Sequence, residues 1–216
     1  MDILSIAISL FVLLFAITVH EASHGWSAMK MGDPTAYAAG RVTLNPLAHI
    51  DPIGTVLLPI VMFIASQGRM TFGWAKPVPV NAYNLRHPRR DLLWISFAGP
   101  IANLLTAAAS AVLFLAVKAW LTGMTEGSVL VKPVVGLANM LLAAFTINLV
   151  LAVFNLIPVP PLDGSGILSG LLSDRAAAVY DRIRPYGFLL IIALAYTRVL
   201  DVIYWPIGVL RNLLVG

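Results

Sequence analysis

The chain alternates long apolar runs with shorter polar stretches that are rich in proline and glycine. A helix needs about 20 apolar residues to cross a hydrocarbon core that is ~30 Å thick. Three runs reach that length, and they predict helices from about Ile3 to Met31, Asp91 to Lys118 and Pro133 to Ile157. A fourth apolar stretch begins near Pro185, is interrupted by Arg198 and Asp201, and continues to Val215. We expect one kinked span in this region, followed by an interfacial tail.

Composition indicates that these runs belong to a membrane protein. Of the 216 residues, 59% are hydrophobic and 11% are charged, and the mean hydropathy is +0.88. Soluble domains carry about 25% charged residues. We therefore predict an all-α polytopic membrane protein that forms one domain over residues 1–216, with a core over about 3–172 and a C-terminal span over about 185–215. Because the sequence begins Met1-Asp2 without a basic n-region, we expect the first helix to be retained rather than cleaved as a signal peptide.

Shorter elements are predicted between the first two helices. Residues 35–44 alternate loosely and contain β-forming residues, a pattern that fits a small β hairpin or strand and equally a surface loop. The apolar stretch at 53–65 is too short to span and contains a proline, so we predict a re-entrant or interfacial segment. Residues 67–90 are polar and rich in proline, glycine and asparagine, which predicts a loop. We expect His49 and His87, in these polar stretches, to be solvated.

The basic residues are distributed unequally between the two sides of the predicted spans. If 53–65 does not cross, ten lie on one side: Lys30, Arg41, Arg69, Lys76, Arg86, Arg89, Arg90, Arg175, Arg182 and Arg184. The other side receives Lys118, Lys132 and Arg211. Because lysine and arginine are enriched on the cytoplasmic side, we predict a protein of the cell membrane whose first helix ends near the cytoplasmic face. No basic run is interleaved with aromatic residues, so nothing indicates a nucleic-acid partner.

The first helix ends in an H-E-x-x-H pattern formed by His20, Glu21 and His24. Histidines four positions apart leave one helix face about 40° apart, which suits two ligands of one tetrahedral zinc ion. Glu21 lies near the same face, where it can hold the attacking water without binding the metal itself. The chain has no cysteine, so histidine and carboxylate side chains are the metal ligands that remain.

The depth of this motif strengthens the prediction of a functional site. At 1.5 Å per residue, His20 lies roughly 26 Å from Ile3 along the helix axis, within the membrane but near one surface. Ionisable groups at such a depth are costly and are retained for function.

The second predicted helix carries the motif Phe97-x-Gly99-Pro100-x-x-Asn103, followed by many alanines. Small residues allow the backbones of neighbouring helices to approach closely, and a proline is tolerated where a partner helix supplies hydrogen bonds. We expect Asn103 to bridge helices rather than to contact a substrate.

The third predicted helix ends in the run Asn155-x-x-Pro158-x-Pro160-Pro161-x-Asp163-Gly164. Its prolines cannot continue a helix, so the chain has to turn into extended backbone. Inside a bilayer such backbone has to be buried by protein or to line a wet cavity. Asp163 is then a candidate third metal ligand, or the N-cap of a short helix from about Gly164 to Leu172, or both.

Together these motifs resemble those of the site-2 protease family, the zinc-dependent intramembrane proteases. The resemblance extends from His20 to Gly164, and it is to short prokaryotic members without a PDZ domain. The stretch Gly73-Trp-Ala-Lys-Pro-Val-Pro-Val80 is also similar to a loop that many short members carry.

The resemblance implies a role for each motif. His20, His24 and Asp163 would be the ligands of one zinc ion, and Glu21 would be the general base and acid. Asn155 occupies the family position that is thought to contact substrate or to stabilise the oxyanion. The first three helices would form the three-helix catalytic core of the family.

The resemblance also implies a class of substrate. The family cleaves single-span membrane proteins in the lipid bilayer, among them anti-sigma factors and membrane-tethered regulators, in regulated intramembrane proteolysis. Because a helical peptide bond is poorly exposed, the substrate has to unwind first. We hypothesise that a strand formed by Arg41, Val42, Thr43 and Leu44 holds the unwound segment by β-addition.

Two other functions are compatible with an H-E-x-x-H motif in a membrane helix. A membrane zinc transporter would need more spans and a second ligand-rich helix, whereas the remaining polar groups lie mostly in predicted loops. A non-catalytic membrane scaffold would need no bound metal. Zinc content and proteolysis therefore discriminate among the three classes.

Overall fold

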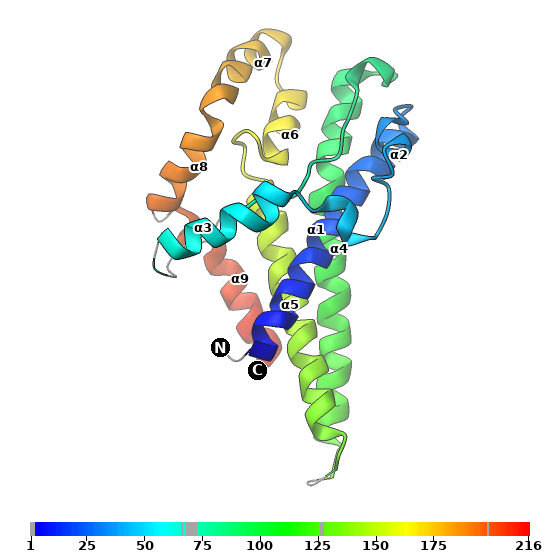
Figure 1. Cartoon of the computed structure of the whole chain (residues 1–216), viewed down its shortest axis with the longest axis vertical. Helices are drawn as coiled ribbons and strands as arrows, with labels where there is room; N and C mark the ends of the chain where they lie inside the picture. Colours follow the sequence, from blue (N-terminus) through cyan, green and yellow to red (C-terminus); the bar gives the residue numbers. More distant parts are fainter. Residues whose placement is uncertain (1–2, 66, 68–72, 126–127, 198) are drawn as a thin grey trace.

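A computed structural model describes residues 3–65, 67, 73–125, 128–197 and 199–216. Three long helices form the bundle drawn in Figure 1: α1 (Ile3–Lys30), α4 (Pro88–Thr122) and α5 (Val131–Asn155). Each is long and apolar enough to cross a membrane, so the three predicted apolar helices are confirmed. The described residues contain no strand, so the all-α prediction is confirmed for them.

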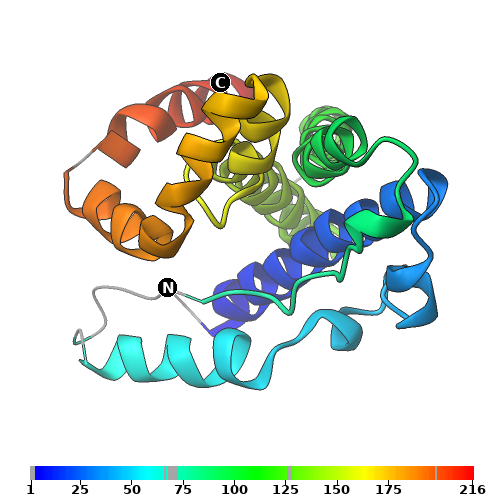
Figure 2. The same cartoon turned by 90° about the horizontal axis from the view of Figure 1, so that it is seen from above.

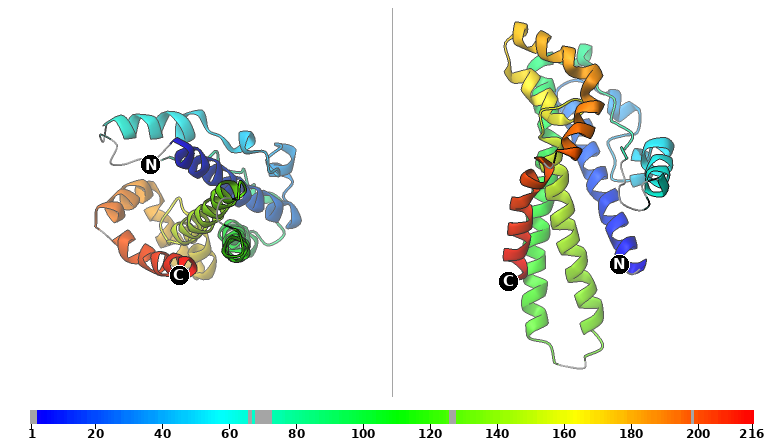
Figure 3. Two further views of the ribbon diagram at one scale, coloured as in Figure 1. Left: turned by 90° about the horizontal axis from the view of Figure 1, so that it is seen from below. Right: turned by 90° about the vertical axis from the view of Figure 1, so that its left-hand side faces the viewer.

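The bundle is held together by close contacts between small residues. Helices α4 and α5 pack against each other as an antiparallel pair, and α1 packs against both of them (Figure 3). Ala16, Ala107 and Ala152 are buried at these contacts, where a small side chain lets two helix backbones approach. The outer surfaces expose large apolar side chains such as Phe11, Leu105, Val112 and Leu113, as expected for helices that face lipid.

The predicted strand between α1 and α4 is wrong. Thr35–Ala38 forms the short helix α2, and Pro46–His49 forms a 3₁₀ turn, η1. Side chains satisfy the backbone between them: the Arg41 guanidinium donates to the carbonyl of Ala48, and His49 Nε2 lies 3.0 Å from the carbonyl of Thr43. These local bonds replace the ladder of a strand. They also bury His49, which is 2% exposed, so the prediction of a solvated His49 is wrong as well.

The prediction of a re-entrant segment is not supported. Pro52–Leu57 forms a π-helical turn, η2, that continues into α3 (Leu58–Ala65). The Asp51 side chain begins this helix by accepting hydrogen bonds from the N–H groups of Ile53 and Gly54, at 2.9 and 2.7 Å. In Figure 1, α3 lies across the long axis of the bundle rather than along it.

The C-terminal third is broken into short helices. They are α6 (Asp163–Leu171), α7 (Asp174–Tyr180), the 3₁₀ segment η4 (Asp181–Tyr186), α8 (Gly187–Tyr196) and α9 (Val199–Val215). The stretch that ends with α8 meets α9 at 65°, and the two together are long and apolar enough to form a fourth, broken span. A kinked element was predicted here, but the bend is sharp enough to make two separate helices.

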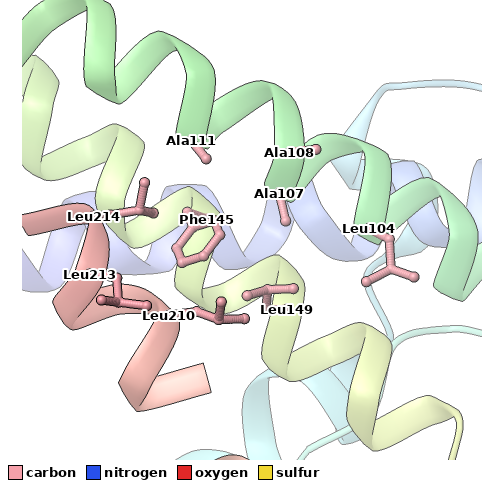
Figure 4. Close-up of a pocket in the computed structure, with 9 residues that line it drawn as sticks. All are labelled: Leu104, Ala107, Ala108, Ala111, Phe145, Leu149, Leu210, Leu213 and Leu214. Atoms are coloured by element: carbon pink, nitrogen blue, oxygen red, sulfur yellow. The ribbon is translucent and has the colours of Figure 1, made fainter. Parts of the chain in front are cut away.

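Helix α9 packs beside α4 and α5 and leaves a cavity of about 330 Å³ between them (Figure 4). Its lining consists of Leu104, Ala107, Ala108, Ala111, Phe145, Leu149, Leu210, Leu213 and Leu214. None of these side chains is ionisable, so the cavity contains no catalytic group.

The loop that joins α3 to α4 is attached to the end of α1 through Asp33. The Asp33 carboxylate is fully buried and accepts hydrogen bonds from the backbone N–H of Asn81 at 2.6 Å and from the side-chain amide of Asn84 at 2.9 Å. It also accepts the N–H of Thr35 at 3.1 Å. Burial by itself raises the pKa of Asp33, but the hydrogen bonds from Thr35, Asn84 and Asn81 outweigh it, so the pKa lies below its ordinary value.

This lowered pKa predicts how the attachment depends on pH. The Asp33 carboxylate stabilises the folded loop fully above the ordinary aspartate pKa of about 4, and that contribution is lost as pH falls through the lower folded value. We expect the protection of the Asn81 amide, measured relative to its intrinsic exchange rate, to fall at acid pH in the wild-type protein. Asp33→Asn should weaken the attachment by about 1–3 kcal/mol at neutral pH and should remove its pH dependence. An unchanged acid response in this variant would contradict the assignment.

Candidate metal centre

Three side chains that can bind a metal converge where α1 meets α4 and α6. His20 and His24 come from α1, and Asp163 is the first residue of α6. The two Nε2 atoms lie 3.1 Å apart, and carboxylate oxygens of Asp163 lie 3.0 Å from Nε2 of His20 and 3.3 Å from Nε2 of His24. The three ligand atoms all lie within 4.8 Å of one another. Residues separated by more than 130 positions in sequence thus form one cluster.

Hydrogen bonds on the far side of each imidazole fix its tautomer. His24 Nδ1 lies 2.6 Å from the carbonyl oxygen of Ile95, which can only accept, so Nδ1 carries the proton. His20 Nδ1 lies 2.6 Å from Oδ1 of Asn103. The amide nitrogen of Asn103 donates to the Ala16 carbonyl at 3.1 Å and to Asn148 Oδ1 at 2.8 Å, so Oδ1 is its accepting end. Both Nε2 atoms therefore direct a lone pair toward Asp163.

This donor set fits a zinc ion. Two ligand atoms about 2.0–2.1 Å from a tetrahedral zinc lie about 3.3–3.4 Å apart, close to the separations of 3.1, 3.0 and 3.3 Å in this cluster. Oδ2 of Asp163 is buried and has no hydrogen-bond donor. Two lone pairs and a carboxylate oxygen that face one another need a cation between them.

Gly99 creates the space for an ion in this cluster. A Cβ atom at this position would lie 2.5 Å from Nε2 of His24 and 2.6 Å from Nε2 of His20. The glycine backbone of α4 therefore faces the two ligand nitrogens directly. This explains why a glycine occurs in the second motif, for which sequence analysis offered no reason beyond helix packing.

Asp163 is directed at the histidines by the packing of the residue that follows it. A Cβ atom at Gly164 would lie 2.3 Å from the Leu156 carbonyl and 2.5 Å from the Ile157 carbonyl, so only glycine allows α6 to begin against the end of α5. The N-cap of α6 is Leu162, and no side chain caps it. The alternative prediction that Asp163 is the N-cap is therefore wrong.

The site is partly accessible to water. The side chain of Asp163 is 19% exposed, and it borders a cavity of about 370 Å³ between α4 and α6. Polar groups in its lining include Arg89, Ser96, Ser165, Ser169 and Arg184. A hydrolytic site inside a bundle needs such a wet path.

The structure also places the other residues that the sequence predicted for the site. Glu21 is half-buried, and its Oε2 accepts the backbone N–H of Val78 at 3.0 Å. Asn155 is the last residue of α5 and donates to the Leu151 carbonyl at 3.0 Å, which leaves its second amide hydrogen available. Val42 does not belong to a strand, but its Cγ2 lies 3.1 Å from the Cβ position of Gly25, beside His24.

Comparison with known proteins assigns the chain to a family. The sequence model of a protein family, described as peptidase family M50, matches residues 8–196 of this chain. The chain belongs to peptidase family M50. Its resemblance to site-2 proteases is thereby confirmed, and the M50 chain is a metalloprotease and a membrane protein.

The relatives that this M50 chain matches carry the name zinc metalloprotease. "Putative zinc metalloprotease YwhC" of Bacillus subtilis is 36% identical over 194 residues, which cover 90% of this chain and 82% of the relative. Rip2 of Mycolicibacterium smegmatis and Rip2 of Mycobacterium tuberculosis H37Rv are 28% and 32% identical over 197 residues, which cover 89% of this chain and 70% of each relative. No solved structure gives a significant match. Zinc is therefore the cofactor of this M50 family chain.

Some residues around the site were not predicted from sequence. Asn148 is 1% exposed and accepts from Asn103, so α1, α4 and α5 are joined by an asparagine pair beside His20. The prediction that Asn103 bridges helices is confirmed. A second polar side chain in the middle of the third apolar run was the available signal for Asn148.

Asn103→Leu should weaken metal binding while leaving the fold intact. Leucine cannot accept the Nδ1–H of His20, which would then be buried without a partner. Loss of such an orienting partner costs about 10- to 100-fold in metal affinity, which a competitive zinc titration measures. Thr106→Ala, which removes a hydroxyl bonded only within α4, is the matched control. Equal zinc affinities in the two variants would contradict the orienting role of Asn103.

Proposed function

We propose that this chain is an intramembrane zinc protease that hydrolyses peptide bonds within or near the span of single-span membrane proteins. The observation that carries the proposal is the His20, His24 and Asp163 cluster, whose ligand atoms lie within 4.8 Å of one another among helices long enough to cross a membrane. A hydrolytic centre at that depth acts on chains that share the bilayer.

In this proposal His20, His24 and Asp163 hold one zinc ion. Zinc, when bound, supplies Lewis acidity that polarises the scissile carbonyl and lowers the pKa of water toward 7. Glu21 accepts the proton of the attacking water and transfers it to the leaving amine. Gly99 leaves the space that the ion and the reacting groups require.

Asn155 is proposed to contact the substrate or to stabilise the oxyanion. Support comes from its place at the end of α5, just before the turn that carries Asp163, and from its half-exposed side chain. One amide hydrogen bonds to Leu151, so the second is the donor that such a role requires.

We propose one membrane protease domain over residues 1–216, in the cell membrane, with the metal centre near the cytoplasmic face. The excess of lysine and arginine in the segments that follow α1 and α5 supports this orientation. Substrates of the proposed kind are membrane-tethered regulators such as anti-sigma factors, which have a single span for the protease to unwind. No nucleic-acid partner is proposed.

The test compares zinc content and proteolysis in matched variants. Purified wild-type protein should contain one zinc ion per chain and cleave a model single-span substrate, and a chelator should abolish cleavage. His20→Ala and Asp163→Ala should lose both zinc and activity, since two remaining ligands hold the ion poorly. His87→Ala, an exposed histidine outside the cluster, should retain both. A zinc-loaded wild type that cleaves no membrane substrate would refute the proposal.

Transport is disfavoured by the distribution of possible ligands. Within the part of the chain that the structure describes, the His20, His24 and Asp163 cluster is the one group of three or more such side chains placed to hold a metal. A transporter needs further ligands along a path through the bilayer. Vesicles that contain the protein and take up zinc would favour transport instead.

A further inference from the structure

The loop that precedes α4 runs extended along α1, close to the candidate base. Figure 2 shows this segment, residues 73–81, beside α1 before it reaches α4. Three of its N–H groups besides that of Val78 make hydrogen bonds: those of Trp74, Lys76 and Asn81 donate to Gly54 O at 3.0 Å, His49 O at 2.9 Å and Asp33 Oδ2 at 2.6 Å. The loop is therefore held against η1, η2 and the turn that follows α1.

The loop contacts α1 next to the metal ligands. The Cβ position of Gly25 lies 3.3 Å from Cγ1 of Val78. Gly25 directly follows His24 in sequence, so the absence of a side chain there lets the loop backbone approach this turn of α1. The approach brings the N–H of Val78 to 3.0 Å from Oε2 of Glu21.

Within the segment Pro77-Val78-Pro79, the N–H of Val78 is the one backbone hydrogen-bond donor. Val78 lies between Pro77 and Pro79, neither of which has a backbone N–H. Both prolines also restrict the backbone to extended conformations. Successive N–H groups of an extended chain point to opposite sides, so those of Trp74, Lys76 and Val78 share one side. On that side they meet the carbonyls of Gly54 and His49 and the carboxylate of Glu21.

A hydrogen bond to an ionised carboxylate is strong enough to orient it. Glu21 is half-buried, and its side chain has three torsions that have to be fixed for the carboxylate to be oriented. A charge-assisted bond from a fixed backbone donor restricts that rotation. One carboxylate oxygen is then occupied by Val78, and the other stays available for the reacting proton.

We propose that the backbone N–H of Val78 is a positioning group for Glu21. It acts through Glu21 and contacts neither the substrate nor the metal ligands. This inference rests on the proposed function, because it assigns Glu21 as the base that the loop orients. The loop thus completes the catalytic site from outside the three-helix core.

The first experiment removes one N–H group. Val78→Pro deletes the donor in a stretch that two prolines already hold extended, so we expect kcat to fall about 10- to 100-fold with KM and zinc content unchanged. Val78→Ala keeps the N–H and should lose much less activity than Val78→Pro. Ala75→Pro, in the same loop, removes an N–H for which the described structure shows no acceptor, and it is the matched control. Wild-type kcat in Val78→Pro, or a change confined to KM, would overturn the proposal.

The second experiment needs no activity. Because prolines carry no amide hydrogen, overlapping proteolytic fragments can isolate hydrogen exchange at Val78 from its neighbours. Glu21→Ala should raise exchange at Val78 about 10-fold or more and should leave Asn81, which Asp33 holds, unchanged. Unchanged exchange at Val78 would overturn the proposal, even if Val78→Pro fails to fold.

The two experiments also distinguish this inference from the proposed function. If the zinc-loaded wild type cleaves nothing, the protease assignment fails, while exchange at Val78 still reports whether Glu21 is held. If the wild type is active, Glu21→Gln is inactive and Val78→Pro behaves as wild type, only the positioning role fails.

Discussion

Glu21→Gln should retain one zinc ion per chain and should lose about 100- to 10,000-fold in kcat for cleavage of a single-span substrate, the range that general-base catalysis supplies. Glutamine has nearly the shape of glutamate and can still accept the Val78 N–H through its amide oxygen. It cannot accept a proton from the attacking water at neutral pH. Metal analysis and a cleavage assay on the same preparation measure the two quantities.

The comparison with Asp163→Ala makes this prediction specific. That variant should lose zinc as well as activity, because Asp163 supplies an oxygen 3.0 Å from Nε2 of His20. Loss of zinc in Glu21→Gln would instead indicate that Glu21 is itself a ligand. A fully active Glu21→Gln protein would exclude the proposed role of the carboxylate.

Gly99→Ala should lower zinc affinity by about 100-fold and abolish proteolysis. The added Cβ would lie 2.5–2.6 Å from the two Nε2 atoms, so either the imidazoles or the α4 backbone has to move. Metal ligands need their positions within a few tenths of an ångström, and displaced second-shell geometry already costs about 10- to 100-fold in affinity. Zinc titration and the cleavage assay measure the effect.

The control for this substitution is another glycine-to-alanine change in a long helix. A Cβ at Gly136 of α5 would meet no atom within 4 Å, so Gly136→Ala should leave zinc binding and activity unchanged. Alanine favours helix over glycine by about 1 kcal/mol, so neither variant should weaken its helix. Normal zinc binding in Gly99→Ala would show that the bundle relaxes around the added methyl group.

The two predictions depend on several features of the site, and only some of these features could be predicted from the sequence. The H-E-x-x-H spacing on one helix face places His20 and His24 together whatever the rest of the fold does, because the helix fixes their separation. The turn rich in prolines likewise requires the third long helix to end before Asp163, and α5 ends at Asn155. Local sequence was sufficient for these features.

The errors arose where side chains of the same loop satisfy the backbone. Residues 35–44 have a strand-like pattern, but Arg41 and His49 bond to carbonyls within the same loop and leave no ladder to form. The segment 52–65 begins as a helix because Asp51 caps it. The strand preference of a short segment is weak, and side-chain hydrogen bonds to the backbone override it.

By itself, the sequence determined three apolar helices long enough to span a membrane, the histidine pair with its neighbouring glutamate, and a resemblance to a family of zinc proteases. The helices and the histidine pair depend on apolar run length and helical spacing, which are local properties, and the resemblance rests on motifs that are short stretches of the chain. Only the tertiary structure decided that Asp163 reaches the histidines, that Gly99 leaves space between them, and that Val78 bonds to Glu21. These depend on how closely distant backbones approach, and no local pattern along the chain encodes that distance.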